Sequence, residues 1–177
     1  MIKLTTPTPN EYAEFYAGYV ERAVARGDVI AALTRQIDDI NAALGNLRDD
    51  QALFRDAPKE WSIKEVMGHL NDVERVFSYR LLRISRNDAT PLPGFEQDDF
   101  VREARFDTHP LGDLILEFEH LRLANILAIN NMSEESTQLM GTASGYAISA
   151  RALIHMLVGH VDHHLESLHE KYLPGIH

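Results

Sequence analysis

Hydrophobic residues recur every three or four positions along most of the chain, which is the spacing of amphipathic helices. From Glu11 to about Leu47 this pattern predicts a helical region, which Gly27 and Asp28 kink or interrupt. Asp28 is a favourable capping residue for the segment that follows it. That segment carries one apolar stripe, made of Val29, Leu33, Ile37, Ile40 and Leu44.

Three further long helices are predicted. The second begins at Ser62 and Glu65, whose spacing matches a capping box, and continues to about Arg86. The third follows a proline and covers Leu111 to about Asn130. The fourth begins at Ile148 or Ser149 and continues to Tyr172.

The connections differ in length. Asn87 to Thr108 includes TPLPGFEQDDF and has no clear period, so a long crossover is expected there, with room for a short helical turn. Asn131 to Gly145 is expected to be a loop, and Gly145 to Ile148 a minor extended piece. Four long helices with almost no strand signal predict an all-α fold, a four-helix bundle forming a single domain over residues 1–177.

Composition narrows the range of partners. The net charge is −10, which disfavours nucleic acid and anionic membrane surfaces. The absence of cysteine excludes disulfides, thiolate metal sites and a cysteine nucleophile. No apolar run approaches the ~20 residues of a membrane span, and the N-terminus lacks the pattern of a signal peptide. A cytoplasmic protein acting on a small molecule is therefore expected.

Histidines concentrate near the C-terminus, where residues 160–169 hold four of the nine. His160 and His164 are one helical turn apart and continue the apolar stripe of Leu153, Leu157 and Leu168. Two adjacent imidazoles in a core need polar partners, and a metal ion supplies one to both. The three histidines that fall off this stripe are expected at the surface or rim: His155, His163 and His169.

A third ligand is available on the second helix. His69 has valines at −3, +4 and +7, which place it on or beside the buried seam, and Gly68 would let two helices approach closely. Histidines at mid-height on two inward faces can converge in a bundle core. His69, His160 and His164 are therefore a candidate metal site, with a hydrogen-bonded core histidine as the alternative interpretation. The chain has no HExxH motif, which excludes a zincin protease.

Three segments in sequence, WSIKEVMGHLNDVERVFSYRLLRISR, TPLPGFEQDDFV and GHVDHHLESL, resemble the DinB-like (DinB/YfiT) superfamily. The resemblance covers about Val20 to Leu168. It implies an up-down-down-up four-helix bundle with a long crossover between helices 2 and 3. It also implies a divalent metal, often nickel or zinc, on the three histidines.

Two acidic residues match the family pattern after the first histidine. Asp72 is the candidate catalytic residue, since it could orient a ligand or reach open coordination positions. Glu74 matches the second acidic position. For both, a solvated or interhelical salt bridge is the alternative.

The resemblance also implies an activity. Relatives include thiol-dependent transferases that use bacillithiol or mycothiol, a glutathione- or mycothiol-dependent maleylpyruvate isomerase, and metal-dependent hydrolases. The leading hypothesis is a thiol-dependent S-transferase in which the metal activates a low-molecular-weight thiol. The alternatives are a hydrolase using metal-bound hydroxide and a non-catalytic, stress-related metal-binding bundle. A homodimer through the first and third helices is expected. An anionic thiol would require Arg or Lys at the mouth of the site, for which Arg75, Arg80 and Arg151 are candidates that no sequence feature places there.

Overall fold

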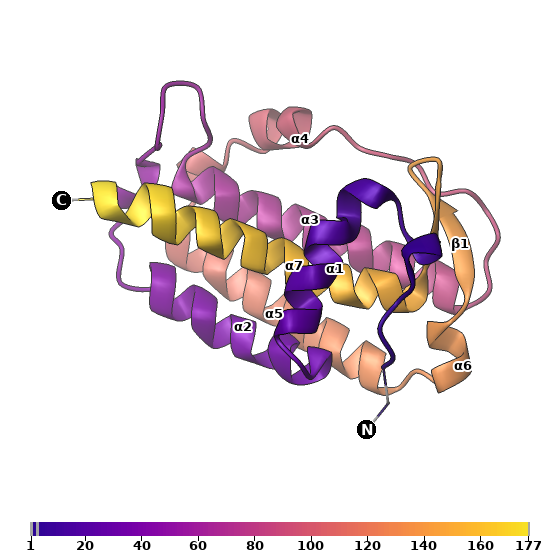
Figure 1. Ribbon diagram of the computed structural model, residues 1–177. Helices are drawn as coiled ribbons and strands as arrows, with labels where there is room; N and C mark the ends of the chain where they lie inside the picture. The colour runs from indigo at the N-terminus through magenta and orange to yellow at the C-terminus, as the bar shows by residue number, and fades with distance from the viewer. Residues whose placement is uncertain (1, 3, 177) are drawn as a thin grey trace.

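The computed structural model describes residue 2 and residues 4–176 (Figure 1). Two short strands form a hairpin, β1 (Met140–Ala143) and β2 (Tyr146–Ser149). The α-helices of the described chain are α1 (Ala17–Ala25), α2 (Val29–Leu44), α3 (Ile63–Ser85), α4 (Gln97–Ala104), α5 (Leu111–Asn130), α6 (Glu134–Thr137) and α7 (Ala150–Ser167). None of these helices has the length and hydropathy that crossing a bilayer requires.

Four helices form the bundle, in the predicted up-down-down-up arrangement (Figure 1). α3 packs against α5 and α7, and α2 packs against the same two helices, so the consecutive helices α2 and α3 lie on a diagonal. α3 and α5 are a parallel pair, which the long connection carrying α4 makes possible. The predicted all-α bundle and its crossover are confirmed.

The helix starts follow from local hydrogen bonds. Asp28 Oδ1 accepts a hydrogen bond from the Ala31 amide at 3.0 Å, and Gly27 has a φ of 79°, so the predicted kink is a complete break between α1 and α2. At α3, Ser62 Oγ accepts from the Glu65 amide at 3.1 Å, and Glu65 Oε2 accepts from the Ser62 amide at 2.8 Å. These reciprocal bonds form the predicted capping box.

The segment from Asn131 to Gly145 was wrongly predicted as a loop. It contains α6 and β1, and β1 pairs with β2 in antiparallel register from Met140–Ser149 to Ala143–Tyr146. Elements of four residues are too short to show a hydrophobic period, and ladder hydrogen bonds rather than apolar burial define the strands. The minor extended piece expected near Ile148 is the second strand of this hairpin.

A buried polar layer divides the core into two apolar clusters. One cluster includes Val29 and Leu33 of α2, and the other includes Ile40 and Leu44. Between them lies buried Gln36, and the other bundle helices change cluster at the same height. The buried polar residues at that height include His69, Asn71 and Glu74 on α3, Arg122 on α5 and His160 on α7. The layer therefore places buried hydrogen-bonding and titratable groups in the middle of the bundle.

The crossing of α1 over α7 depends on a glycine (Figure 1). A Cβ atom at Gly159 would lie 1.8 Å from the Tyr19 carbonyl oxygen, so Gly159→Ala must separate the two helices. We expect it to lower the free energy of unfolding by about 1–3 kcal/mol, measured by urea denaturation. Gly18→Ala is the control, because its Cβ meets nothing within 4 Å and should stabilise α1 by up to about 1 kcal/mol. A Gly159→Ala variant as stable as the wild type would contradict the close contact.

Candidate metal centre

Three imidazoles from two helices converge at the edge of the polar layer. His69 Nε2 of α3 lies 3.1 Å from His160 Nε2 of α7, and the ring centroids of His160 and His164 are 4.6 Å apart. One nitrogen from each of the three rings lies within 4.8 Å of the other two. His69 and His160 are buried and His164 is half-buried. The structure thus brings together the three histidines that the sequence singled out.

Burial keeps these imidazoles neutral. Desolvation lowers the pKa of His69 to about 4 and that of His164 to about 3, with neighbouring histidines adding smaller effects. The pKa of His160 is lowered well below its ordinary value, first by burial and then by His164 and His69. Neutral imidazoles retain the lone pair with which histidine binds metals.

The nitrogen geometry fits a divalent ion. Two nitrogens 3.1 Å apart can both bind an ion at about 2.0–2.1 Å with an angle of about 100°, between octahedral and tetrahedral values. Three neutral nitrogen donors without thiolate suit nickel or zinc. Within the described residues no fourth histidine or carboxylate joins the cluster. The cluster could therefore hold a metal while leaving coordination positions for an outside molecule.

Aromatic side chains surround the histidines. The Trp61 ring lies 4.7 Å from that of His69, and the Tyr19 and Phe77 rings lie 5.5 and 6.0 Å from that of His160. These rings form apolar walls beside the imidazoles. None of the three aromatic residues was predicted from the sequence, because helical spacing does not distinguish a site wall from ordinary core.

Two cavities border the cluster. One of about 380 Å³ reaches His69 and His160 and is lined by aromatic residues, by Ser144 and by Glu96 and Asp98 at the start of α4. We call it the aromatic pocket. A smaller cavity of about 160 Å³ borders His164 together with Trp61 and Tyr172. A small molecule can therefore approach the histidines through the aromatic pocket.

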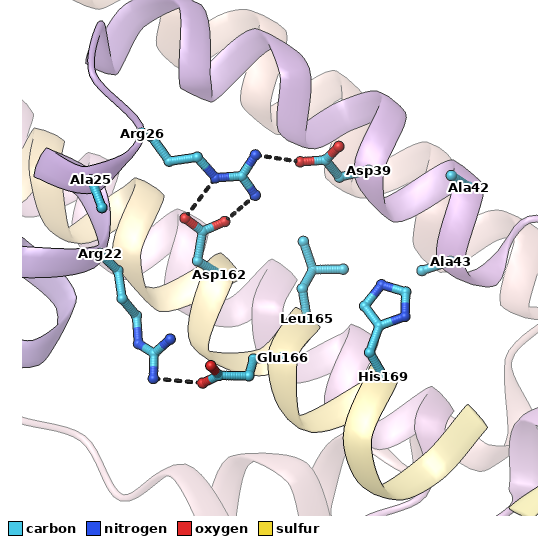
Figure 2. Close-up of a pocket in the computed structure, with 10 residues that line it drawn as sticks. All are labelled: Arg22, Ala25, Arg26, Asp39, Ala42, Ala43, Asp162, Leu165, Glu166 and His169. Carbon is cyan, nitrogen blue, oxygen red and sulfur yellow. Dashed lines mark hydrogen bonds and ion pairs between the residues drawn. The ribbon is translucent and has the colours of Figure 1, made fainter. Parts of the chain in front are cut away.

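The largest cavity lies elsewhere. It has a volume of about 590 Å³ and borders α2 and α7, and Figure 2 shows Arg26 ion-paired with Asp162 and Asp39 and Arg22 with Glu166. Among the described residues that line it, His169 alone carries an imidazole. Although this cavity is larger, we do not take it as the functional site, because its charged groups already neutralise one another.

The two predicted acidic residues lie away from the histidine cluster. Glu74 is buried and forms a bidentate ion pair with Arg122, at 2.8 and 2.9 Å, so its alternative interpretation as an interhelical salt bridge is correct. Asp72 is half-buried and lines neither cavity at the histidines. Burial first, and then Glu117 of α5, raise the pKa of Asp72. A catalytic role for Asp72 stays a prediction that this geometry does not support.

The candidate arginines for the site are also elsewhere. Arg75 pairs with Glu117 and Arg151 pairs with Glu11, whereas Arg80 donates hydrogen bonds to Pro93 O and Ser144 Oγ. None of the three lines the aromatic pocket.

The three histidines that were predicted to lie off the apolar stripe differ in their exposure. The placement of His155 at the surface was wrong. It is buried, its Nδ1 lies 2.8 Å from the Arg151 carbonyl oxygen, and α1 and the N-terminal segment cover its side of α7. His163 and His169 are exposed, as predicted.

Solved structures show a similar fold. The first is YfiT from Bacillus subtilis, described as a probable metal-dependent hydrolase with an unusual four-helix bundle topology. It is 13% identical with a TM-score of 0.74, over 96% of this chain and 92% of that one. The second is a mycothiol-dependent maleylpyruvate isomerase, 14% identical with a TM-score of 0.67, over 80% of this chain and 59% of that one.

Sequence comparison gives the family. No curated protein matches the chain significantly. A sequence profile of the DinB superfamily matches residues 32–168, which contain all three histidines of the cluster. That match covers most of the chain, and the protein belongs to the DinB superfamily.

Proposed function

We propose that the protein is a metal-dependent enzyme that transfers a low-molecular-weight thiol to an electrophilic small molecule. The observation that carries the proposal is the convergence of three neutral imidazoles, two buried and one half-buried, beside an open pocket, with no fourth ligand in the described chain. A structural metal site would be closed by a fourth protein ligand. Nickel and zinc are the metals we propose.

His69, His160 and His164 would hold the metal, and the rings of Trp61 and Phe77 would form apolar walls beside it. When bound, a divalent ion lowers the pKa of a coordinated thiol and favours the thiolate near neutral pH. This chemistry requires no protein cysteine, and the chain has none. The aromatic pocket, at about 380 Å³, is in the range of small-ligand sites.

Hydrolysis is the second candidate. Glu96 and Asp98 line the aromatic pocket, and a carboxylate there could serve as a general base toward water. The similarity to YfiT, a probable metal-dependent hydrolase, also favours this candidate. The predicted homodimer and the cytoplasmic location stay predictions.

The test uses untagged protein loaded with nickel or zinc. Conjugation of glutathione, bacillithiol or mycothiol to monochlorobimane is followed by fluorescence, and ester hydrolysis is followed in parallel without thiol. We expect conjugation to exceed the metal-free rate at least tenfold with one of the thiols. His160→Ala should lose this activity, and His169→Ala, which removes an exposed histidine outside the cluster, should retain it.

Two other outcomes would each favour a different function. Thiol-independent hydrolysis that requires His160 would support the second candidate and contradict the transferase. Stoichiometric metal without either activity would leave a non-catalytic metal-binding bundle.

A further inference from the structure

Arg80 of α3 is a buried arginine without a carboxylate partner in the described chain. Arg80 and Arg122 are 2% and 0% exposed. Arg122 is ion-paired with Glu74, but the ion pairs of the described residues do not include Arg80. The arginines at the largest cavity are also paired (Figure 2). Burying an uncompensated charge is unfavourable, so Arg80 is a candidate for binding an anion from outside the chain.

The hydrogen bonds of Arg80 leave part of its guanidinium free. Nη2 donates to the Pro93 carbonyl oxygen and to Ser144 Oγ, both at 2.9 Å, and both acceptors are neutral. Nε and Nη1 have no acceptor among the described residues, and neither is among the polar atoms that are fully buried without a partner. These N–H groups are therefore without an acceptor in a side chain that lines a cavity.

That space is a cavity of about 300 Å³, which we call the Arg80 slot. Its walls are mainly apolar and include the rings of Tyr79, Phe95 and Phe100. Arg75 also lines the slot, and none of the lining residues is acidic. Arg75 is paired with Glu117, so Arg80 is the lining charge that no carboxylate of the described residues compensates. In a chain of net charge −10, the charge of Arg80 favours an anion at this slot.

We propose that the Arg80 slot binds a small aromatic carboxylate. The planar guanidinium matches the geometry of a carboxylate and can donate two parallel hydrogen bonds to it. The aromatic walls would contact the ring of the ligand, with Phe95 and Phe100 already 5.2 Å apart between centroids. The slot shares Phe95 with the aromatic pocket but includes none of the three histidines, and binding of an anion to Arg80 does not depend on the proposed metal or on the proposed activity.

The test compares 2-naphthoate with 2-naphthamide, its uncharged counterpart, by isothermal titration calorimetry on the full chain. EDTA-treated protein is used, so that a carboxylate bound to a metal does not contribute. We expect naphthoate to bind at least tenfold more tightly than naphthamide. Arg80→Gln, which keeps a donor for Ser144 but removes the charge, should abolish this difference. Arg86→Gln, which removes an exposed arginine from the end of the same helix, should leave it unchanged.

A second variant tests the walls of the slot. Phe100 is 45% exposed, so Phe100→Ala should fold normally, and it should weaken naphthoate and naphthamide by similar factors. Equal affinity of the wild type for the two ligands, or no binding at millimolar concentration, would overturn the proposal whatever the stability of Arg80→Gln. In that case Arg80 is a structural link between the Pro93 segment and the hairpin.

Discussion

Glu74→Gln is expected to lower the free energy of unfolding by about 3–5 kcal/mol, because it leaves Arg122 charged, buried and unpaired. Glu74 is 2% exposed and Arg122 is fully buried. Both carboxylate oxygens of Glu74 accept hydrogen bonds from Arg122, and Oε1 also accepts from Asn125 at 2.8 Å. The side chain is therefore at the centre of the polar layer. Urea unfolding at pH 7, with the slope of the transition unchanged, measures the loss.

A surface pair provides the matched control. Glu117 joins the same two helices through Arg75, but these side chains are 35% and 48% exposed. Glu117→Gln should therefore change the free energy of unfolding by less than about 1 kcal/mol. The double variant Glu74→Leu/Arg122→Met, which removes both buried charges, should recover part of the loss of Glu74→Gln. Equal losses in Glu74→Gln and Glu117→Gln would show that burial does not govern the strength of the pair.

Metal removal is expected to have the second large effect. A ligand that binds the folded state alone stabilises it by about 4 kcal/mol when its free concentration is 1,000 times its Kd. For a chain of this length that corresponds to a rise of roughly 8–16 °C in the melting temperature. Differential scanning calorimetry with and without a chelator, followed by added nickel or zinc, measures the shift.

The control for metal removal is a histidine variant. His164→Ala should melt at the same temperature with and without metal, because two imidazoles bind an ion weakly. His169→Ala, which removes an exposed histidine, should show the full shift. A metal-dependent shift that persists in His164→Ala would place the ion at a different site.

The bundle could be predicted from sequence because its helices are long and have clear borders. Asp28 and Ser62 are typical N-cap residues, so each marks the start of a helix. The apolar stripe after Asp28 repeats over several helical turns. The spacing of His160 and His164 predicted that both rings lie on one face of their helix. The valines around His69 predicted that His69 lies on or beside the buried seam. Local periodicity is sufficient for such features, because each depends on residues close together in the chain.

The remaining features depend on contacts between distant segments. Glu74 meets Arg122 across 48 positions, and Gln36 Nε2 donates to the Val158 carbonyl oxygen across 122. No local pattern pairs these residues, and a charged residue on an apolar face is usually exposed. The catalytic role of Asp72 stays a prediction for the same reason, because spacing along a helix does not specify which neighbour its side chain faces. His155 was misplaced because α1 and the N-terminal segment cover that side of α7.

The most direct test of the account is the metal content of untagged protein, measured by inductively coupled plasma mass spectrometry. We expect about one nickel or zinc ion per chain in the wild type and in His169→Ala, and less than about one tenth of that in His69→Ala and His160→Ala. These two variants remove imidazoles from different helices, so only a shared ion explains loss in both. Equal metal in the wild type and both variants, with the variants folded by circular dichroism, would contradict the account.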